Sequence, residues 1–300
     1  MKVREMDIEI YRNYMNALEA SPEPAWRYDE TRPCGATFNS AVVARAYDTY
    51  HGRFRDFSRG SEEIICLLKL SAGDTVIDMG CGTGAFAVHA AGRCAKVYAV
   101  DPSRAMLRRA RKKAQQAGLA NIEFHQGGFL TYRHDAEPVD AAVSSLPLHH
   151  LPDLWKLVAL IRVAEMLKAG GRLYLRDVVF AFDAGEYESA IEEHIESMVD
   201  WIGPEMRHAL EVHISKEYST CGWIIEGLLD RAGFQIETAD YRDDFMAAYL
   251  CTKVDRLQCV GEGHGHRAKA ECSNAHRQRT SREPVPAIRI CQGRRRKAPV

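Results

Sequence analysis

The stretch Val76-Ile77-Asp78-Met79-Gly80-Cys81-Gly82-Thr83-Gly84 joins a short apolar strand to a glycine-rich turn, and a small-residue helix is expected to follow it over 85–91. Glycine tolerates a positive φ and lets another molecule approach the backbone closely. The N-terminus of the following helix presents free N–H groups. This segment therefore predicts a site for a nucleotide-like ligand at the carboxyl edge of a parallel sheet.

A second strand that ends in an acid supports this prediction. Val97-Tyr98-Ala99-Val100 is followed by Asp101, 21 residues after Gly80. A carboxylate at this position can accept hydrogen bonds from both hydroxyls of a ribose. NAD and S-adenosyl-L-methionine would both satisfy this pattern.

The spacing of the turn separates these two cofactors. The glycines read G-x-G-x-G, whereas a dinucleotide-binding turn reads G-x-G-x-x-G. Asp78 precedes the first glycine by two residues, where an acid suits a ligand with ammonium and sulfonium groups and would repel a pyrophosphate. Both features favour S-adenosyl-L-methionine, and an NAD(P)-dependent oxidoreductase remains an alternative.

Strands and helices alternate around this turn. Strands are expected at 75–78, 96–100, 122–125, 139–144 and 172–179, with helices between them. Such alternation implies a parallel sheet with helices on both faces. Residues 181–220 interrupt it with helical segments, and a helix at 223–232 leads to a closing antiparallel pair at 234–238 and 245–252.

Four motifs in this order resemble those of the class I S-adenosylmethionine-dependent methyltransferases, closest to the ubiquinone/menaquinone-type and other small-molecule enzymes. They are VIDMGCGTGAFA (76–87), VYAVDPS (97–103), VDAAVSSLPLHHLPD (139–153) and LKAGGRLYLRDVV (167–179). The resemblance covers about residues 40–253. It implies an α/β fold, a Rossmann-like three-layer sandwich with a seven-stranded, mostly parallel sheet whose last strand is reversed.

We expect the chain to have three parts. A helical lid would occupy 1–60, and the methyltransferase domain 61–253, with 181–220 as a helical cap insertion. Residues 254–300 form a basic tail in which the hydrophobic pattern fails, which predicts disorder. The tail contains residues of zinc-binding types without the paired short spacings of a structural site, so no metal is expected. These residues are Cys259, His264, His266, Cys272 and His276.

The resemblance also implies cofactor-binding residues. Asp78, Gly80 and Gly82 would contact the methionine part, and Asp101 the ribose. Met106, together with Ser103, would lie near the adenine. Further contacts are implied for Tyr47, Cys81, Pro102, Gly128, Phe129 and Ser144. The family commonly has an acid after the third strand that binds the adenine amine, but this chain reads QGGF (126–129), so adenine is expected to rely on backbone groups and Phe129.

Candidates for catalysis follow the fourth strand and the insertion. His149 or His150 could act as a base near the methyl group, or could pack structurally against the strand. Tyr218 could line the acceptor pocket, as could Trp223, for which a core position is the alternative. In-line displacement from a sulfonium depends largely on positioning, and a base is needed only when the nucleophile carries a proton.

Composition limits the partners and the compartment. The net charge of −1 gives no field that would attract nucleic acid. No stretch approaches the roughly 20 apolar residues of a membrane span. Nine cysteines without C-x-x-C, and no apolar core of a signal peptide, predict a cytoplasmic protein.

The sequence thus predicts methyl transfer to a small-molecule acceptor. The fourth strand ends in Ser144-Ser145-Leu146-Pro147, not in the N-P-P-Y type of motif common in enzymes that methylate base amines, and the insertion is acidic. Both features make nucleic acid an unlikely partner. An RNA or protein methyltransferase, and a non-catalytic cofactor-binding module that acts through its basic tail, remain alternatives.

Overall fold

A computed structural model describes residues 26–32, 34–35 and 38–254 of the chain. The expected tail from residue 255 onward, with its cysteines and histidines, lies outside these residues, as do residues 1–25 of the expected lid. Among the described residues, no helix is long and apolar enough to cross a membrane.

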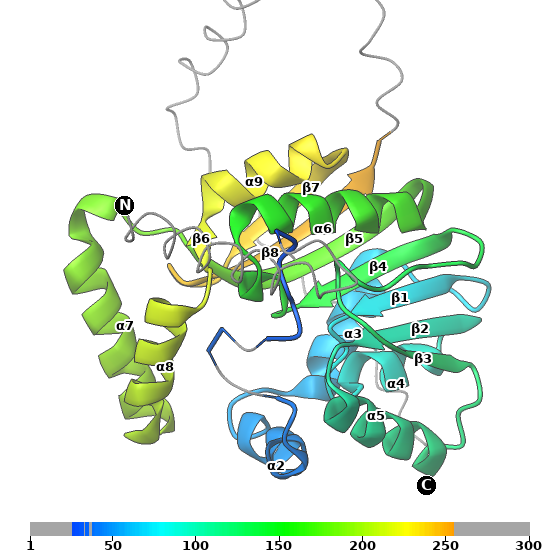
Figure 1. The fold of residues 1–300 in the computed structure, drawn as a ribbon, viewed down its shortest axis with the longest axis horizontal. Coiled ribbons are helices and arrows are strands. Elements are labelled where there is room, and N and C mark those ends of the chain that lie inside the picture. Colours follow the sequence, from blue (N-terminus) through cyan, green and yellow to red (C-terminus); the bar gives the residue numbers. More distant parts are fainter. Residues whose placement is uncertain (1–25, 33, 36–37, 255–300) are drawn as a thin grey trace, which may run out of the picture. The chain divides into compact units, whose positions relative to one another are not determined.

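A mixed sheet forms the centre of this part of the chain, with the strand order β3-β2-β1-β4-β5-β8-β7 (Figure 1). Strands β1 to β5 pair in parallel, whereas β8 runs antiparallel to both β5 and β7. The strands are β1 (Thr75–Met79), β2 (Lys96–Asp101), β3 (Ile122–Gln126), β4 (Val139–Ser145), β5 (Leu167–Phe180), β6 (Thr220–Cys221), β7 (Phe234–Tyr241) and β8 (Met246–Lys253). The predicted mostly parallel sheet with a reversed last strand is therefore confirmed. An additional strand, β6, pairs with β5, and its two residues are too short to give a sequence pattern.

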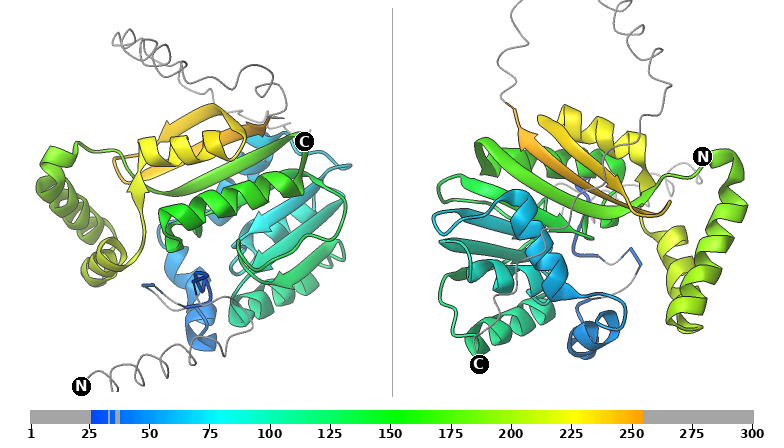
Figure 2. Two further views of the ribbon diagram at one scale, coloured as in Figure 1. Left: turned by 45° about the horizontal axis from the view of Figure 1, so that its top comes forward. Right: turned by 180° about the vertical axis from the view of Figure 1, so that it is seen from behind.

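Helices cover both faces of the sheet, which makes three layers (Figure 2). Along β1, Ile77 and Met79 pack toward α6 and α9, whereas Val76 packs toward α3 and α4. This alternation follows from the two-residue period of a strand, and burial on both faces explains why the strand is apolar almost throughout. The helices of these layers are α3 (Phe57–Leu68), α4 (Ala85–Ala91), α5 (Arg104–Gln116), α6 (Asp153–Met166) and α9 (Gly222–Arg231).

The remaining helices lie at the carboxyl edge of the parallel strands, where Figure 1 shows α2 and the α7–α8 pair beside the sheet. They are α2 (Ala41–His51), α7 (Tyr187–Ile202) and α8 (Glu205–Lys216), and two short 3-10 turns, η1 (Leu148–His150) and η2 (Ala184–Glu186), complete the described elements. Helix α2 packs on α5 through Ala44, which contacts Ala105 and Met106. The insertion between β5 and β6 is thus helical.

One local expectation differs from the structure. Ser103 caps α5, its hydroxyl accepting from Met106 N. Asp153 lies in the first turn of α6 and binds Lys156 Nζ at 2.8 Å. Trp223 is neither core nor pocket, because it is 74% exposed on α9. The buried face of that helix is carried by Ile225 and Leu229.

Candidate functional site

The glycine turn lies at the carboxyl end of β1 and is clamped to the neighbouring strand. Gly80 N and Cys81 N both donate to Val100 O, at 2.8 and 3.0 Å. Gly80, Gly82 and Gly84 have φ values of 76°, 55° and 78°, which only glycine adopts at low cost. A Cβ added at Gly82 would meet nothing within 4 Å. This part of the turn is therefore open to a ligand.

The carboxylate of Asp101 is part of the same turn. It accepts hydrogen bonds from Gly82 N and Ser103 N, both at 2.8 Å, and the residue is 7% exposed. Burial raises the pKa of Asp101 to about 6, while the two N–H donors act in the opposite direction. A carboxylate has about four acceptor sites, so this one is fixed in orientation and can still accept from ligand hydroxyls.

Two buried polar atoms beside the turn have no hydrogen-bond partner among the described residues: Asp78 Oδ2 and Ser144 Oγ. They lie on adjacent strands, since Met79 pairs with Ser144. Burial, together with the charge of Asp101, raises the pKa of Asp78 to about 7. Buried polar atoms are nearly always paired, so these two point to a ligand that carries donors and positive charge.

Helix α2 lies against the turn. Thr83 Oγ1 donates to Asp48 Oδ1 at 2.5 Å, and Lys113 Nζ binds Asp48 Oδ2 at 2.8 Å. Tyr47 on the same helix lies 6.0 Å from the ring of Phe38, and Phe38 O accepts from Ser103 Oγ at 2.8 Å. Segment 38–51 is therefore tied to the end of β2, near Asp101.

The loops after β2 and β3 hold the residues expected near adenine. Pro102 O accepts from Gln126 Nε2 at 3.3 Å, and Met106 is buried beneath α2. Phe129 is buried in the core on the α6 side, and its carbonyl accepts from Arg162 Nε at 2.8 Å. The aromatic ring thus belongs to the protein core.

Beside Gly128, an acid arrives from the N-terminal part of the chain. The Glu30 carboxylate accepts from Leu130 N at 3.0 Å and from Thr131 N at 2.8 Å. A Cβ at Gly128 would lie 2.4 Å from Glu30 Oε2. Because Gly128 has no side chain, the Glu30 carboxylate fits beside it. An acid thus lies at the loop after β3, although it comes from a distant segment of the chain.

The loop after β4 leads from the glycine turn to a cluster of polar residues. Leu146 has a φ of 72°, which is strained for a side chain of this size. Leu146 N donates to Arg176 O at 2.8 Å, and Pro147 packs against Gly80. The next residues form η1, which carries His149 and His150.

His149 is held between two carboxylates. Its Nδ1 lies 2.5 Å from Asp177 Oδ1, and its Nε2 lies 3.3 Å from Glu217 Oε2. Asp177 Oδ2 also accepts from Leu148 N at 2.7 Å and from His149 N at 3.2 Å. His213 on α8 binds the same Glu217 through Nδ1. Strand β5, η1 and the end of α8 thus bring these groups together.

The pKa values of the two adjacent histidines are shifted in opposite directions. Burial acts to lower the pKa of His149, but Asp177 and Glu217 outweigh it and raise the pKa to about 9. Burial and the charge of His149 lower the pKa of His150 to about 4. At neutral pH, His149 is therefore an imidazolium within an ion-pair chain, and His150, whose Nδ1 lies 3.4 Å from Cys34 Sγ, is a neutral imidazole.

Aromatic residues enclose this cluster. Tyr218 N donates to His149 O at 2.8 Å, and Tyr28 OH donates to His150 O at 3.0 Å. The rings of Tyr28 and Tyr218 lie 6.2 Å apart at a steep angle. Trp26 stacks on Trp155 and is otherwise exposed. Tyr218, expected at the acceptor pocket, thus lies beside both expected histidines.

Four residues of the site were not predicted from the sequence: Glu30, Asp177, His213 and Glu217. Asp177 had a readable signal, because it lies near the carboxyl end of a parallel strand next to the one that ends at Ser145. His213 and Glu217 lie in a helical segment where acids and histidines are normally solvated. Only the path of the chain brings them to η1.

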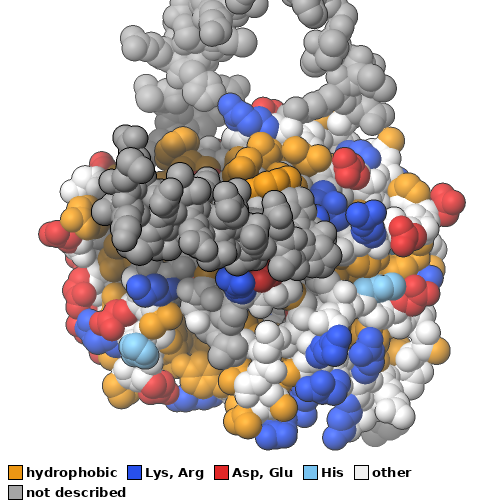
Figure 3. Space-filling model, in the orientation of Figure 1, with side chains coloured by type: hydrophobic (Ala, Val, Ile, Leu, Met, Phe, Trp, Pro, Cys, Tyr) orange, Lys and Arg blue, Asp and Glu red, His pale blue; other side chains and the backbone are white. Residues whose placement is uncertain are grey.

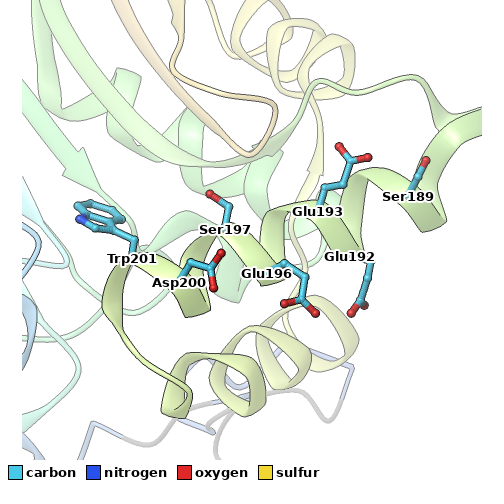
Figure 4. Close-up of a pocket in the computed structure, with 7 residues that line it drawn as sticks. All are labelled: Ser189, Glu192, Glu193, Glu196, Ser197, Asp200 and Trp201. Atoms are coloured by element: carbon cyan, nitrogen blue, oxygen red, sulfur yellow. The ribbon is translucent and has the colours of Figure 1, made fainter.

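A separate pocket lies along α7 (Figure 4), and its lining residues all come from that helix. They are Ser189, Glu192, Glu193, Glu196, Ser197, Asp200 and Trp201. Two of the acids, Glu192 and Glu196, form ion pairs with Arg207 of α8. This surface is therefore explained by the charged contact between the two helices, and no group from the glycine turn lines it.

Comparisons with known proteins agree with this geometry. Residues 76–171 match the family model described as "Methyltransferase domain". An uncharacterized methyltransferase of Geobacillus kaustophilus (strain HTA426) is 29% identical over 195 residues, which cover 65% of this chain and 85% of the relative.

Solved structures share the fold. A SAM-dependent methyltransferase from Aquifex aeolicus superposes with a TM-score of 0.51 at 18% identity, over 72% of this chain and 99% of that one. The magnesium protoporphyrin IX methyltransferase of Synechocystis PCC 6803, solved with bound SAM, gives a TM-score of 0.52 at 18% identity, over 76% and 99%. Residues 76–171 thus match a methyltransferase domain model, and the solved structures show that the chain has the Rossmann-like fold.

Proposed function

We propose that this protein transfers a methyl group from S-adenosyl-L-methionine to a small-molecule acceptor. The observation that carries the proposal is the unpartnered Oδ2 of Asp78, buried close to the carboxylate of Asp101. Two neighbouring buried acids each raise the pKa of the other unless a cation lies between them or beside them. An adenosyl sulfonium with an amino-acid ammonium group supplies such charge.

The residues of the turn fit this ligand part by part. Asp78 would accept from the ammonium group, with Ser144 beside it. The open backbone at Gly82 would lie against the methionine part, and Asp101 would accept from the ribose hydroxyls. Cys81 and Gly80 hold the turn, and their N–H groups are already committed to Val100 O. Adenine would lie toward the loops that carry Pro102, Met106 and Gly128.

The bound cofactor supplies a methyl group on positively charged sulfur, which a nucleophile attacks in line. The protein's own part is positioning and water exclusion. Tyr47 and Phe38 would cover the cofactor from the α2 side. His150, neutral and next to Tyr218, is the better placed of the two histidines to accept a proton from an acceptor, because His149 is already paired with Asp177.

The surroundings favour a small acceptor. The rings of Tyr28 and Tyr218 offer an aromatic wall at the histidine cluster. The acidic surface of α7 would repel a phosphate backbone. One observation supports the RNA alternative: α5 carries six Lys and Arg residues, and Figure 3 shows basic side chains gathered on that side. Two of these, Arg109 and Lys113, are engaged by Asp48.

Titration calorimetry tests the cofactor assignment directly. The full chain is titrated with S-adenosylmethionine, S-adenosylhomocysteine and NAD, and we expect binding of the first two only. Asp101→Ala should weaken that binding by roughly 1–3 kcal/mol because a buried ribose contact is lost. Binding of NAD with no binding of either adenosyl compound would refute the proposal.

Methyl transfer itself is measured with a methyl-labelled cofactor and a panel of acceptors. The panel contains phenols, thiols, amines, RNA and protein. We expect label on a small molecule, with phenols of the quinone-precursor type as the first candidates. Label on RNA alone, lost when Arg108 and Arg111 of α5 are replaced by Ala, would favour the RNA alternative.

A further inference from the structure

We infer that His149, His150 and Glu217 form a binding site for a divalent transition-metal ion. Nothing in the proposed methyl transfer requires this ion, and the site lies outside the glycine turn. The argument rests on the convergence of ligand atoms, on the groups that orient them, and on their burial.

The three residues each direct one donor atom to the same place. These atoms all lie within 4.8 Å of one another. His149 Nε2 lies 3.3 Å from Glu217 Oε2, and His150 Nδ1 lies 4.0 Å from Glu217 Oε1. Donors that bind one ion at about 2.0–2.2 Å lie roughly 3–4 Å apart. The three donors therefore lie slightly farther apart than the ligands of a bound ion, and a shared ion would draw them together.

The imidazole of His149 is oriented from behind by a second group. Asp177 Oδ1 holds His149 Nδ1 at 2.5 Å, which turns Nε2 toward Glu217. A carboxylate on the far nitrogen of a histidine is the usual support of a metal ligand. His213, whose Nδ1 also contacts Glu217, has its Nε2 2.9 Å from Ser219 Oγ.

The cluster is buried, which separates it from ordinary surface acids. The side chains of His149, Asp177 and Glu217 are 8%, 2% and 5% exposed. Two carboxylates and three imidazole rings share this space. A cation there would lie between carboxylates that are shielded from water.

The donor set indicates which ions fit. Imidazole nitrogen with one carboxylate suits Zn²⁺, Fe²⁺ or Co²⁺, whereas Mg²⁺ and Ca²⁺ prefer oxygen ligands alone. Cys34 Sγ lies 3.4 Å from His150 Nδ1, so this thiol borders the site without being counted among its ligands. Three protein ligands leave a four-coordinate ion one position for water or a substrate atom.

That open position suggests a class of acceptor. An acceptor with a hydroxyl or thiol would bind the ion through its oxygen or sulfur atom and release its proton to water more readily, because a bound cation lowers the pKa of its ligand. This step rests on the proposed function. The existence of the metal site does not.

The test uses the full chain after treatment with a chelator. Zn²⁺, Co²⁺ and Mg²⁺ are titrated by calorimetry, and the visible absorption of Co²⁺ reports its coordination. We expect binding of Zn²⁺ and Co²⁺ but not Mg²⁺. Glu217→Gln and His150→Ala should each weaken Zn²⁺ binding by at least about tenfold. Thermal unfolding of each variant without metal checks that it is folded.

Two controls make the result specific. His89→Ala removes a histidine that lies 3.0 Å from Glu62 in a surface pair, and it should leave Zn²⁺ binding unchanged. A chain with Cys259, His264, His266, Cys272 and His276 all replaced by Ala should still bind. The inference would be overturned if the wild-type chain did not bind Zn²⁺, or if the tail variant were the only variant that lost binding. These metal titrations contain no adenosyl compound, so neither result bears on the methyl-transfer proposal.

Discussion

Pro147 fills the space that a side chain at Gly80 would need. A Cβ built on Gly80 would lie 2.6 Å from both Cβ and Cγ of Pro147. This contact joins the turn after β1 to the loop after β4, and so connects the expected cofactor site with η1. The same position has a φ of 76°. Two independent constraints thus require glycine here.

Gly80→Ala should therefore lower both stability and cofactor binding. The left-handed backbone costs a non-glycine residue about 1–2 kcal/mol, and overpacking against Pro147 adds about 1–3 kcal/mol. Urea unfolding and calorimetry with S-adenosylmethionine measure the two effects. Gly73→Ala is the control, because a Cβ there meets nothing within 4 Å, and unfolding free energies equal for the two variants would contradict the packing argument.

Asp78→Asn should raise the stability of the ligand-free protein while it lowers cofactor affinity. The buried carboxylate has an unpartnered oxygen and a raised pKa, so removing its charge should not destabilise the ligand-free protein above pH 7 and should stabilise it by on the order of 1–3 kcal/mol. Cofactor affinity should fall roughly 10- to 100-fold, because a charged hydrogen bond is lost. Denaturant unfolding and calorimetry provide the measurements. A variant that loses stability but keeps its affinity would show that Asp78 serves the fold.

The raised pKa values of Asp78 and Asp101 predict a pH dependence of cofactor binding. Both groups have folded pKa values above the ordinary 3.8, about 7 and about 6. Their contribution to the stability of the ligand-free protein is therefore present below about pH 4 and is lost as pH rises through these values. A cationic ligand favours the ionised forms, so its affinity should rise with pH between about 5.5 and 7.5.

Thermal unfolding with and without S-adenosylmethionine across this range checks the expectation. The gain in midpoint temperature should increase with pH in the wild-type protein and should be flatter in Asp78→Asn. Comparison at each pH removes the effect of other titrating groups. A gain that is constant from about pH 5.5 to 7.5 would mean that the ligand does not rely on these carboxylates.

Much of the fold could be predicted because the parallel strands are buried on both faces. β1, β2 and β4 are mostly apolar and lie between turn residues, which is a local signal. The positive φ at Gly80 and Gly82 follows from the glycine pattern. β6 was missed because its two residues pair with β5 only after the insertion has returned to the sheet. Trp223 was misjudged because a large apolar residue on a helix does not reveal which face is buried.

The site was predictable only where it follows from the strand order. Asp78, Asp101 and Ser144 lie at adjacent strand ends, so the topology brings them together. Glu30 accepts from Leu130 N in the loop after β3, although the two residues are 100 positions apart in the sequence. Glu217 reaches η1 through the insertion. Contacts of this kind depend on loop paths, which no local pattern encodes.

Asp177 should contribute strongly to stability. Its carboxylate binds His149 and accepts from three backbone N–H groups, so Asp177→Ala leaves His149 Nδ1 and three backbone donors without this buried acceptor. Breaking a buried pair in this way costs about 3–5 kcal/mol. Urea unfolding in the presence of a chelator measures it without any bound metal.

Glu62→Gln is the matched control for that loss. Glu62 binds His89 at 3.0 Å, but both side chains are partly exposed, so the cost should stay below about 1 kcal/mol. Equal losses in the two variants would indicate that burial does not strengthen the Asp177 pair.

The contact between Glu30 and Gly128 predicts a coupling that a double-mutant cycle can detect. Gly128→Ala places a Cβ 2.4 Å from Glu30 Oε2, which should expel the carboxylate from Leu130 N and Thr131 N. Glu30→Ala removes the same hydrogen bonds directly. Because either change alone breaks the contact, the double variant should lose less stability than the sum of the two, by about 0.5–3 kcal/mol. Urea unfolding gives the four free energies, and limited proteolysis should show faster cleavage near residues 26–35 in all three variants. Strictly additive losses would mean that Glu30 does not fasten this segment to the β3 loop.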